Sequence, residues 1–303
     1  MNACRRLVCP RLTSRAALLL PLLLTGCSLF PTTRKLPVPK PPLVTQTISP
    51  EELVGHLNDR WAAINTLTAK VEFHVSVAKS KEGVATDYPS VEGHIIMRKP
   101  ALLRVVGQMI GIRVFDMASD GNDFTLSIPH ESKVIKGSNS VKHKSANAWE
   151  NLRPGFFFDA LLVRGLDPNN PDDHYSVTSE TFMVEDAAKK HLFSVPEYIL
   201  RIARATAGSQ KETPVRVVYF HRDDLLPYQQ DVYDSDGNLE TQVIYSSYQD
   251  FEGGKFPSTV TIKRPLEETQ IVLTVEDVHE NLPIADDTFV LKTPEGATVV
   301  NRD

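Results

Sequence analysis

Cysteine is nearly absent from this chain of 303 residues, because its three cysteines, Cys4, Cys9 and Cys27, all lie near the N-terminus. The rest of the chain has no thiol, which excludes a disulfide framework, a cysteine-based zinc cluster and a cysteine nucleophile there. Hydrophobic residues make up 41% of the chain and charged residues 23%, so wholesale disorder is also excluded.

Long hydrophobic runs are also missing. The apolar run from Ala16 to Leu24 is far shorter than the roughly 20 residues that a membrane-spanning helix needs. Arginines precede it and Leu24-Thr25-Gly26-Cys27 ends it, which is the arrangement of a secretory signal peptide. The segment is therefore predicted to be a signal peptide over residues 1–26.

The tetrapeptide at positions 24–27 resembles the lipobox of bacterial lipoproteins. That resemblance implies cleavage before Cys27, which would become the first residue and carry several acyl chains. Each buried methylene contributes about 0.8 kcal/mol, so several chains would anchor the protein in a membrane lastingly. Ser28 follows, where aspartate commonly signals inner-membrane retention, so the resemblance implies an outer-membrane lipoprotein facing the periplasm. An ordinary signal peptide with an incidental cysteine is the alternative.

Net basic charge is lacking as well. Without residues 1–26, which hold four arginines and no acid, 29 Lys and Arg face 38 Asp and Glu. An acidic protein of this kind is not expected to bind nucleic acid.

Prolines are concentrated between the predicted lipidation site and the folded region. Residues 27–49 are predicted to be a lipidated cysteine followed by a semi-rigid tether, and its extended form could reach about 70 Å at roughly 3.1 Å per residue. The prolines on which this rests are Pro31, Pro37, Pro39, Pro41, Pro42 and Pro50.

Residues 50–303 are predicted to form one β domain that begins with a helix. Ser49 is suited to the N-cap, Pro50 to the first helical position and Glu52 to a capping box. The apolar residues Leu53, Leu57, Trp61 and Ile64 then recur at helical spacing, which predicts an amphipathic helix that covers another surface.

From Leu67 onward the hydrophobic period becomes two, which predicts strands. The tetrapeptide Ser-Asp-Gly-Asn occurs at 119–122 and again at 235–238, in each case as a tight turn between strands. The fold class is therefore mainly β (α+β), a strongly curved antiparallel sheet. The predicted strands are 67–77, 91–98, 101–107, 112–118, 122–128, 131–136, 191–206, 215–221, 228–234, 239–249, 256–264 and 269–279.

One apolar segment interrupts the strands. Pro154 can start a short helix over the sequence Phe156-Phe157-Phe158-Asp159-Ala160-Leu161-Leu162-Val163, which is apolar almost all round. Two interpretations stay open: a core helix, or a lid over an apolar cavity.

This order of elements resembles the LolA/LolB superfamily of lipoprotein carriers and acceptors, and LolB-like proteins in particular. The local likeness is best over residues 98–114, and the general likeness covers about 50–165, while the C-terminal strands make the chain longer than a typical LolB. The resemblance implies a half-open β-barrel whose cavity receives acyl chains. It also implies that Met109 and Ile110 form a protruding loop that transfers acyl chains into the membrane; the alternative is that both fold back under the sheet.

Alternating apolar residues supply candidates for such a cavity, although a packed core would use the same residue types. The lipid-cavity candidates are Phe73, Val75, Ile95, Met97, Val105, Val114, Leu126, Phe157, Leu161, Leu200, Val217 and Val260.

Motifs of catalysis are missing too: the chain has no G-x-S-x-G, G-x-G-x-x-G, Walker or H-E-x-x-H pattern. No catalytic residue, metal ligand or cofactor is therefore assigned. A surface metal site formed by His74 and His94 with Glu72 and Glu92 is a minor alternative.

Together these features predict a monomeric, non-enzymatic lipoprotein that binds acyl chains or lipoproteins during their localisation. Its partners would be membrane lipid, through acylated Cys27, and a periplasmic carrier. The alternative is a regulatory or scaffold lipoprotein of the cell envelope that uses the same fold to bind a protein partner.

Overall fold

The structure is a computed structural model that describes residues 45–79, 82–139, 154–167, 170, 172–185, 192–205 and 212–302. The predicted signal peptide, Cys27 and the tether up to residue 44 lie outside the described residues. Neither α-helix of the described ranges is long and apolar enough to cross a bilayer.

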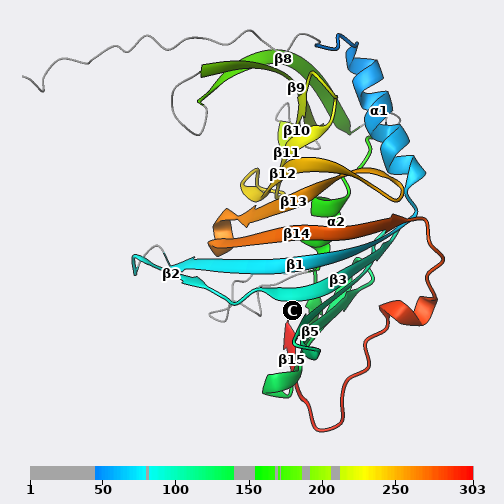
Figure 1. The fold of residues 1–303 in the computed structure, drawn as a ribbon, viewed down its shortest axis with the longest axis vertical. Coiled ribbons are helices and arrows are strands. Elements are labelled where there is room, and N and C mark those ends of the chain that lie inside the picture. Colours follow the sequence, from blue (N-terminus) through cyan, green and yellow to red (C-terminus); the bar gives the residue numbers. More distant parts are fainter. Residues whose placement is uncertain are drawn as a thin grey trace, which may run out of the picture.

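A large curved sheet of 15 strands dominates the described chain, which confirms the predicted mainly β fold. The strands follow one another from β8 at one edge to β15 at the other (Figure 1). Neighbours are antiparallel except β15 and β7, which are parallel, and β2 pairs only with β1. The spatial order is β15-β7-β6-β5-β4-β3-β1-β14-β13-β12-β11-β10-β9-β8.

The elements have the following bounds along the chain. They are α1 Pro50–Ala63, β1 Thr66–Lys79, β2 Val84–Asp87, β3 Val91–Arg98, β4 Leu102–Met109, β5 Ile112–Ser119, β6 Asp123–Ile128, η2 Pro129–Glu131, β7 Lys133–Ser138, α2 Gly155–Leu161, β8 Asp173–Glu185, β9 Leu192–Ala205, β10 Glu212–His221, β11 Pro227–Tyr233, β12 Leu239–Phe251, β13 Gly254–Arg264, η4 Pro265–Glu267, β14 Thr269–Glu280, η5 Asp286–Phe289 and β15 Thr298–Arg302.

The capping box predicted for α1 is present. The Ser49 hydroxyl accepts a hydrogen bond from the Glu52 amide at 3.2 Å, and the Glu52 carboxylate accepts one from the Ser49 amide at 2.7 Å. Leu53 and Leu57 are buried against the sheet, whereas Trp61 is half-buried. The cap therefore fixes where α1 begins, and its apolar stripe fixes which face lies on the sheet.

We predict that Ser49→Ala lowers the free energy of unfolding by about 1 kcal/mol, because the Glu52 amide loses its only side-chain acceptor. Urea denaturation measures this change. Glu51→Ala, at an exposed position in the first turn of α1, is the control and should cost clearly less; equal losses for both variants would contradict the role of the cap.

Side chains fill the concave face of β1 and β3–β5. Phe73 and Phe115 pack edge to face with centroids 5.6 Å apart. They lie over glycines: a Cβ at Gly107 would come within 2.3 Å of the Phe115 ring, and one at Gly93 within 2.8 Å of the Phe73 ring. The two glycines thus let large rings approach the backbone of the sheet.

The short helix α2 completes this core. Phe156, Phe157 and Phe158 are all at least nine-tenths buried, and Phe157 packs edge to face on Phe73 at 6.1 Å. In Figure 1, α2 lies behind β13 and β14. Of the two interpretations of this segment, the packing fits the core helix, because the aromatic side chains of α2 occupy the space between α2 and the sheet.

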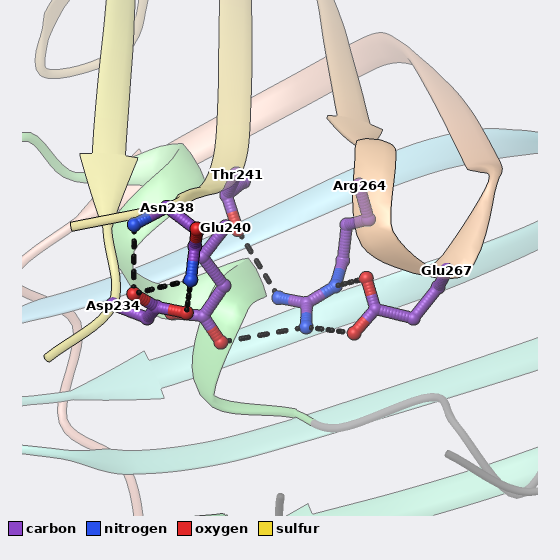
Figure 2. A network of polar contacts seen from close by, with 6 residues as sticks. All are labelled: Asp234, Asn238, Glu240, Thr241, Arg264 and Glu267. Atoms are coloured by element: carbon purple, nitrogen blue, oxygen red, sulfur yellow. Dashed lines mark hydrogen bonds and ion pairs between the residues drawn. The ribbon is translucent and has the colours of Figure 1, made fainter. Parts of the chain in front are cut away.

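A buried arginine holds α2 against β13. The Arg264 guanidinium is 5.1 Å from the centre of the Phe156 ring and forms an ion pair with Glu267 at 2.7 Å. It also donates to the Thr241 hydroxyl at 3.1 Å and reaches Glu240 at 3.5 Å, as Figure 2 shows. Because these oxygens accept hydrogen bonds from the guanidinium, its positive charge is tolerated although Arg264 is only 6% exposed.

Candidate functional site

Most predicted cavity residues belong to the packed core and not to a hollow. Leu200 lies in a second core cluster beneath α1, and Val75 and Val114 pack half-buried against the first cluster. The fully or nearly fully buried members of the first cluster are Phe73, Ile95, Met97, Val105, Leu126, Phe157, Leu161 and Val260.

Val217 lies on the other face of the sheet from the remaining predicted set. It lies opposite Asp231 in the sheet and points away from its neighbours Val218 and Phe220, which are in the core under α1. Both faces of β10 carry apolar side chains, so alternation alone does not identify the inner face. Val217 therefore points to the opposite face of β10 from Val218 and Phe220.

A hollow does exist, but in a different place. A cavity of about 340 Å³, here called the α1 pocket, lies between α1, the residues that end and follow α2, and strands β10–β13. Its apolar wall is formed by Leu57, Leu161, Leu162, Val163, Phe220 and Phe256. This volume is within the range of about 300–1,000 Å³ that is usual for small-molecule sites.

Two hydrogen bonds hold the walls of the α1 pocket in place. The Asn58 side chain on α1 accepts from the Leu166 amide at 2.7 Å, which ties the segment after α2 to α1. The Tyr248 hydroxyl donates to the Pro227 carbonyl at 2.7 Å, which closes the floor between β12 and β11. The pocket is thus bounded by a fixed framework on both sides.

Tyrosine hydroxyls give the pocket a small polar component. Tyr245 accepts a hydrogen bond from the buried Gln230 side chain at 2.7 Å. Burial raises the pKa of both Tyr245 and Tyr248 well above the usual value, so both stay neutral at physiological pH. An uncharged, largely apolar lining suits a hydrocarbon chain.

Charged residues gather at the mouth. His56 and Arg60 come from α1, Asp224 from the β10–β11 connection and Lys255 from β13. Arg60 is held there by an ion pair with Glu280 on β14. The mouth thus offers two cations, Arg60 and Lys255, next to an apolar interior, an arrangement that fits an amphipathic ligand with an acidic head.

The predicted loop at Met109 and Ile110 is the second candidate site, after the α1 pocket. Ile110 is 96% exposed and Ile112 is 73% exposed, while Met109 is exposed to a smaller extent. Ile110 and Gly111 form the two-residue turn between β4 and β5, with φ values of 50° and 73°. Such turns favour Asn-Gly, so an exposed isoleucine in this left-handed conformation is unusual. We call residues 109–112 the apolar tip.

We predict that Ile110→Gly raises the free energy of unfolding by about 1 kcal/mol, because glycine relieves the strain of a β-branched residue at positive φ. Thermal and urea denaturation test this. Ile112→Gly, at the first residue of β5, is the control and should not stabilise the protein. Equal effects of the two substitutions would show that Ile110 is unstrained.

The minor alternative of a metal site does not match the register of the sheet. His94 lies opposite Lys70 and not opposite His74, whereas Glu72 lies opposite Glu92. Among the residues that the structure describes, no group of three or more His, Cys, Asp or Glu is placed to hold a metal ion.

No protein-family model matches the chain. No curated protein matches it either. Among solved structures, it is similar to a DUF1329 family protein from Desulfovibrio piger, with a TM-score of 0.51 and 14% identity over 79% of this chain and 95% of that chain.

Two further solved structures are more distantly similar. A LolA superfamily protein from Nitrosomonas europaea has a TM-score of 0.48 and 13% identity over 81% of this chain and 99% of that chain. A putative outer membrane lipoprotein-sorting protein domain from Vibrio parahaemolyticus has a TM-score of 0.45 and 12% identity, covering 79% and 94%. At 14% identity, the likeness to the Desulfovibrio piger protein concerns the fold alone.

Proposed function

We propose that this protein is a membrane-anchored lipoprotein that binds an acyl chain of a lipid or lipoprotein in the α1 pocket and passes it to a membrane. No covalent bond of the ligand would change. The observation that carries the proposal is the α1 pocket itself, an apolar cavity of about 340 Å³ that opens between α1 and the sheet. Burial of each methylene there would contribute about 0.8 kcal/mol.

The lining of the pocket supports one orientation of the ligand. The hydrocarbon chain would lie against Leu57, Val163 and Phe256, and the polar end would remain at the mouth. There Lys255 and Arg60 would attract a carboxylate or phosphate. A saturated fatty acid such as palmitate is therefore a suitable first probe.

The apolar tip supports the membrane step. Ile110 and Ile112 present apolar surface to solvent at the end of a hairpin, where polar residues are the rule. Insertion of each side chain into lipid would contribute roughly 1.5–3 kcal/mol. Acylation of Cys27 and an outer-membrane location facing the periplasm are parts of the same proposal.

Titration with a fluorescent fatty acid tests the proposal. We expect saturable binding to the unacylated chain that starts at Ser28, with displacement by palmitate. Lys255→Glu should weaken palmitate binding several-fold because it reverses a charge at the mouth, whereas Lys292→Glu, in the segment after η5, should not. Absence of saturable binding, or equal losses in the two variants, would argue against the pocket as the site.

A further inference from the structure

The convex face of β8–β11, which points away from α1 and α2, carries a group of aromatic rings. Tyr228 is at its centre: its ring stacks on His221 at 4.4 Å and lies 6.0 Å from both Tyr219 and Phe182. Tyr219 and His221 point to this side because their neighbours Val218 and Phe220 point into the core. All these rings are half-buried, so their rims meet solvent.

Two carboxylates lie beneath these rings. Glu197 and Asp231 are each only 6% exposed. Glu197 accepts a hydrogen bond from the Tyr228 hydroxyl, and Asp231 accepts from the Gln229 and Gln242 amides at 3.0 and 3.1 Å. We call Phe182, Glu197, Tyr219, Tyr228 and Asp231 the tyrosine platform.

The platform holds negative charge without a matching cation. Within the described part of the chain, neither Glu197 nor Asp231 forms an ion pair, since their partners are neutral hydroxyls and amides. Burial raises the pKa of Tyr219 to about 12, and the charge of Asp231 adds to this shift. Burial also raises the pKa of Tyr228, with a further contribution from its hydrogen bond to Glu197. Buried carboxylates without a cation are costly, which favours a cationic group brought by a ligand.

Other charged residues on this face do not neutralise the negative charge of Glu197 and Asp231. Arg201 is already paired with Glu180 at 3.0 Å and donates to Thr178 at 2.6 Å. Lys263 on β13 lies opposite Gln242, and Gln242 lies opposite Asp231, so Lys263 is two strands away from Asp231. The Glu180–Arg201 pair is neutral as a unit, so the two carboxylates beneath the rings remain in excess.

We propose that the tyrosine platform docks an extended segment of a protein partner that carries two Lys or Arg residues four positions apart. Aromatic faces and buried carboxylates both attract ammonium and guanidinium groups. The negative charge disfavours nucleic acid and anionic lipid surfaces as partners. This proposal does not depend on acyl-chain binding, because the platform and the α1 pocket are on opposite faces of the sheet.

The spacing follows from the register. Glu197 lies opposite His221 on β10, and Asp231 lies opposite Val217, four residues away. Two strand spacings and four residues separate the carboxylates by about 17 Å. Four residues of an extended chain span roughly 13–14 Å, and the length of Lys or Arg side chains covers the remaining 3–4 Å or so. Side chains four apart on an extended chain point to the same side, so two basic residues at this spacing lie over the rings above both carboxylates.

Peptide binding to the unacylated chain that starts at Ser28 tests the proposal. The probe is a peptide in which arginines recur at every fourth position, and its control has the same composition with adjacent arginines. We expect the spaced peptide to bind more tightly, and less so at high salt. Glu197→Gln combined with Asp231→Asn should weaken its binding about tenfold, while Glu72→Gln with Glu92→Gln, the same charge change elsewhere in the sheet, should not.

A second variant covers the case in which the first one loses stability. Gln242→Lys would place an ammonium group beside Asp231 without removing any buried group, and should also weaken the spaced peptide about tenfold. Thermal denaturation reports whether each variant is folded. Failure of the wild type to bind the peptide, equal binding of the two peptides, or unchanged binding in Gln242→Lys would each overturn the proposal.

Discussion

Replacement of Ile110 and Ile112 together by glutamate should weaken binding of the protein to lipid vesicles by about 100-fold or more. Both side chains are largely exposed in the absence of a membrane, so the substitution removes no packing from the core. Each isoleucine would lose roughly 1.5–3 kcal/mol of apolar transfer, and each added carboxylate opposes insertion. Co-sedimentation of the unacylated chain with vesicles of neutral lipid measures the effect without contributions from acyl groups or surface charge.

The matched control for this prediction is Val290→Glu combined with Val299→Glu. These valines are 61% and 44% exposed and lie near the C-terminus, remote in sequence from the apolar tip. The control adds the same two charges and removes a smaller exposed apolar area. If it weakened vesicle binding as much as the variant of the tip, membrane contact would be a general surface effect and the tip would have no special role.

The second large effect is expected at the α1 pocket. Leu226→Trp should reduce palmitate binding by about 100-fold, because the larger ring would occupy part of a cavity of about 340 Å³ that Leu226 lines. Leu226 is half-buried at the mouth, so the indole can project into the open cavity without displacing the core. Fluorescence titration measures affinity, and urea denaturation should show nearly unchanged stability.

Leu266→Trp provides the control for that experiment. Leu266 belongs to η4 and is 51% exposed, so the same substitution there leaves the pocket open. Affinity for palmitate should remain at the wild-type value. Equal affinity of all three proteins would place the bound fatty acid outside the α1 pocket.

Local patterns in the sequence predicted the elements that have a strong local signal. The capping box at Ser49 and the alternation from Leu67 identified α1 and β1, and the Asp-Gly turns marked hairpins. Three strands were not predicted. In β8 the side chains are mostly exposed on both faces, so alternation is weak; β2 is fully exposed; and β15 exists only because it pairs with the distant β7.

The place of the hollow was less predictable. Apolar alternation in β1, β3 and β5 correctly marked buried positions, but whether a buried face is packed or open depends on what covers it. Here Phe156, Phe157 and Phe158 fill the expected cavity. The α1 pocket arises where α1, the segment after α2 and the β10–β11 connection meet, and no local pattern indicates that their side chains leave a gap.

The apolar tip and the tyrosine platform differ in how far apart their residues lie in the sequence, and this decides how well each could be predicted. The resemblance to LolB-like proteins singled out Met109 and Ile110. The positive φ of Ile110, which the structure shows, is an independent physical reason to regard this turn as unusual. The tyrosine platform was missed because Glu197 and Asp231 are far apart in the chain. Only the register of β9, β10 and β11 brings them together.

The most direct test of acyl binding is to photo-crosslink a palmitate analogue with a diazirine near the end of its chain and to map the adducts by mass spectrometry. We expect adducts at the wall of the α1 pocket, on Leu57, Val163 or Tyr248, and their loss when unmodified palmitate competes. Adducts on Phe157 or Val260, in the core between α2 and the sheet, would contradict the α1 pocket as the acyl-binding site. Labelling that is scattered over the surface and that palmitate does not reduce would contradict it as well.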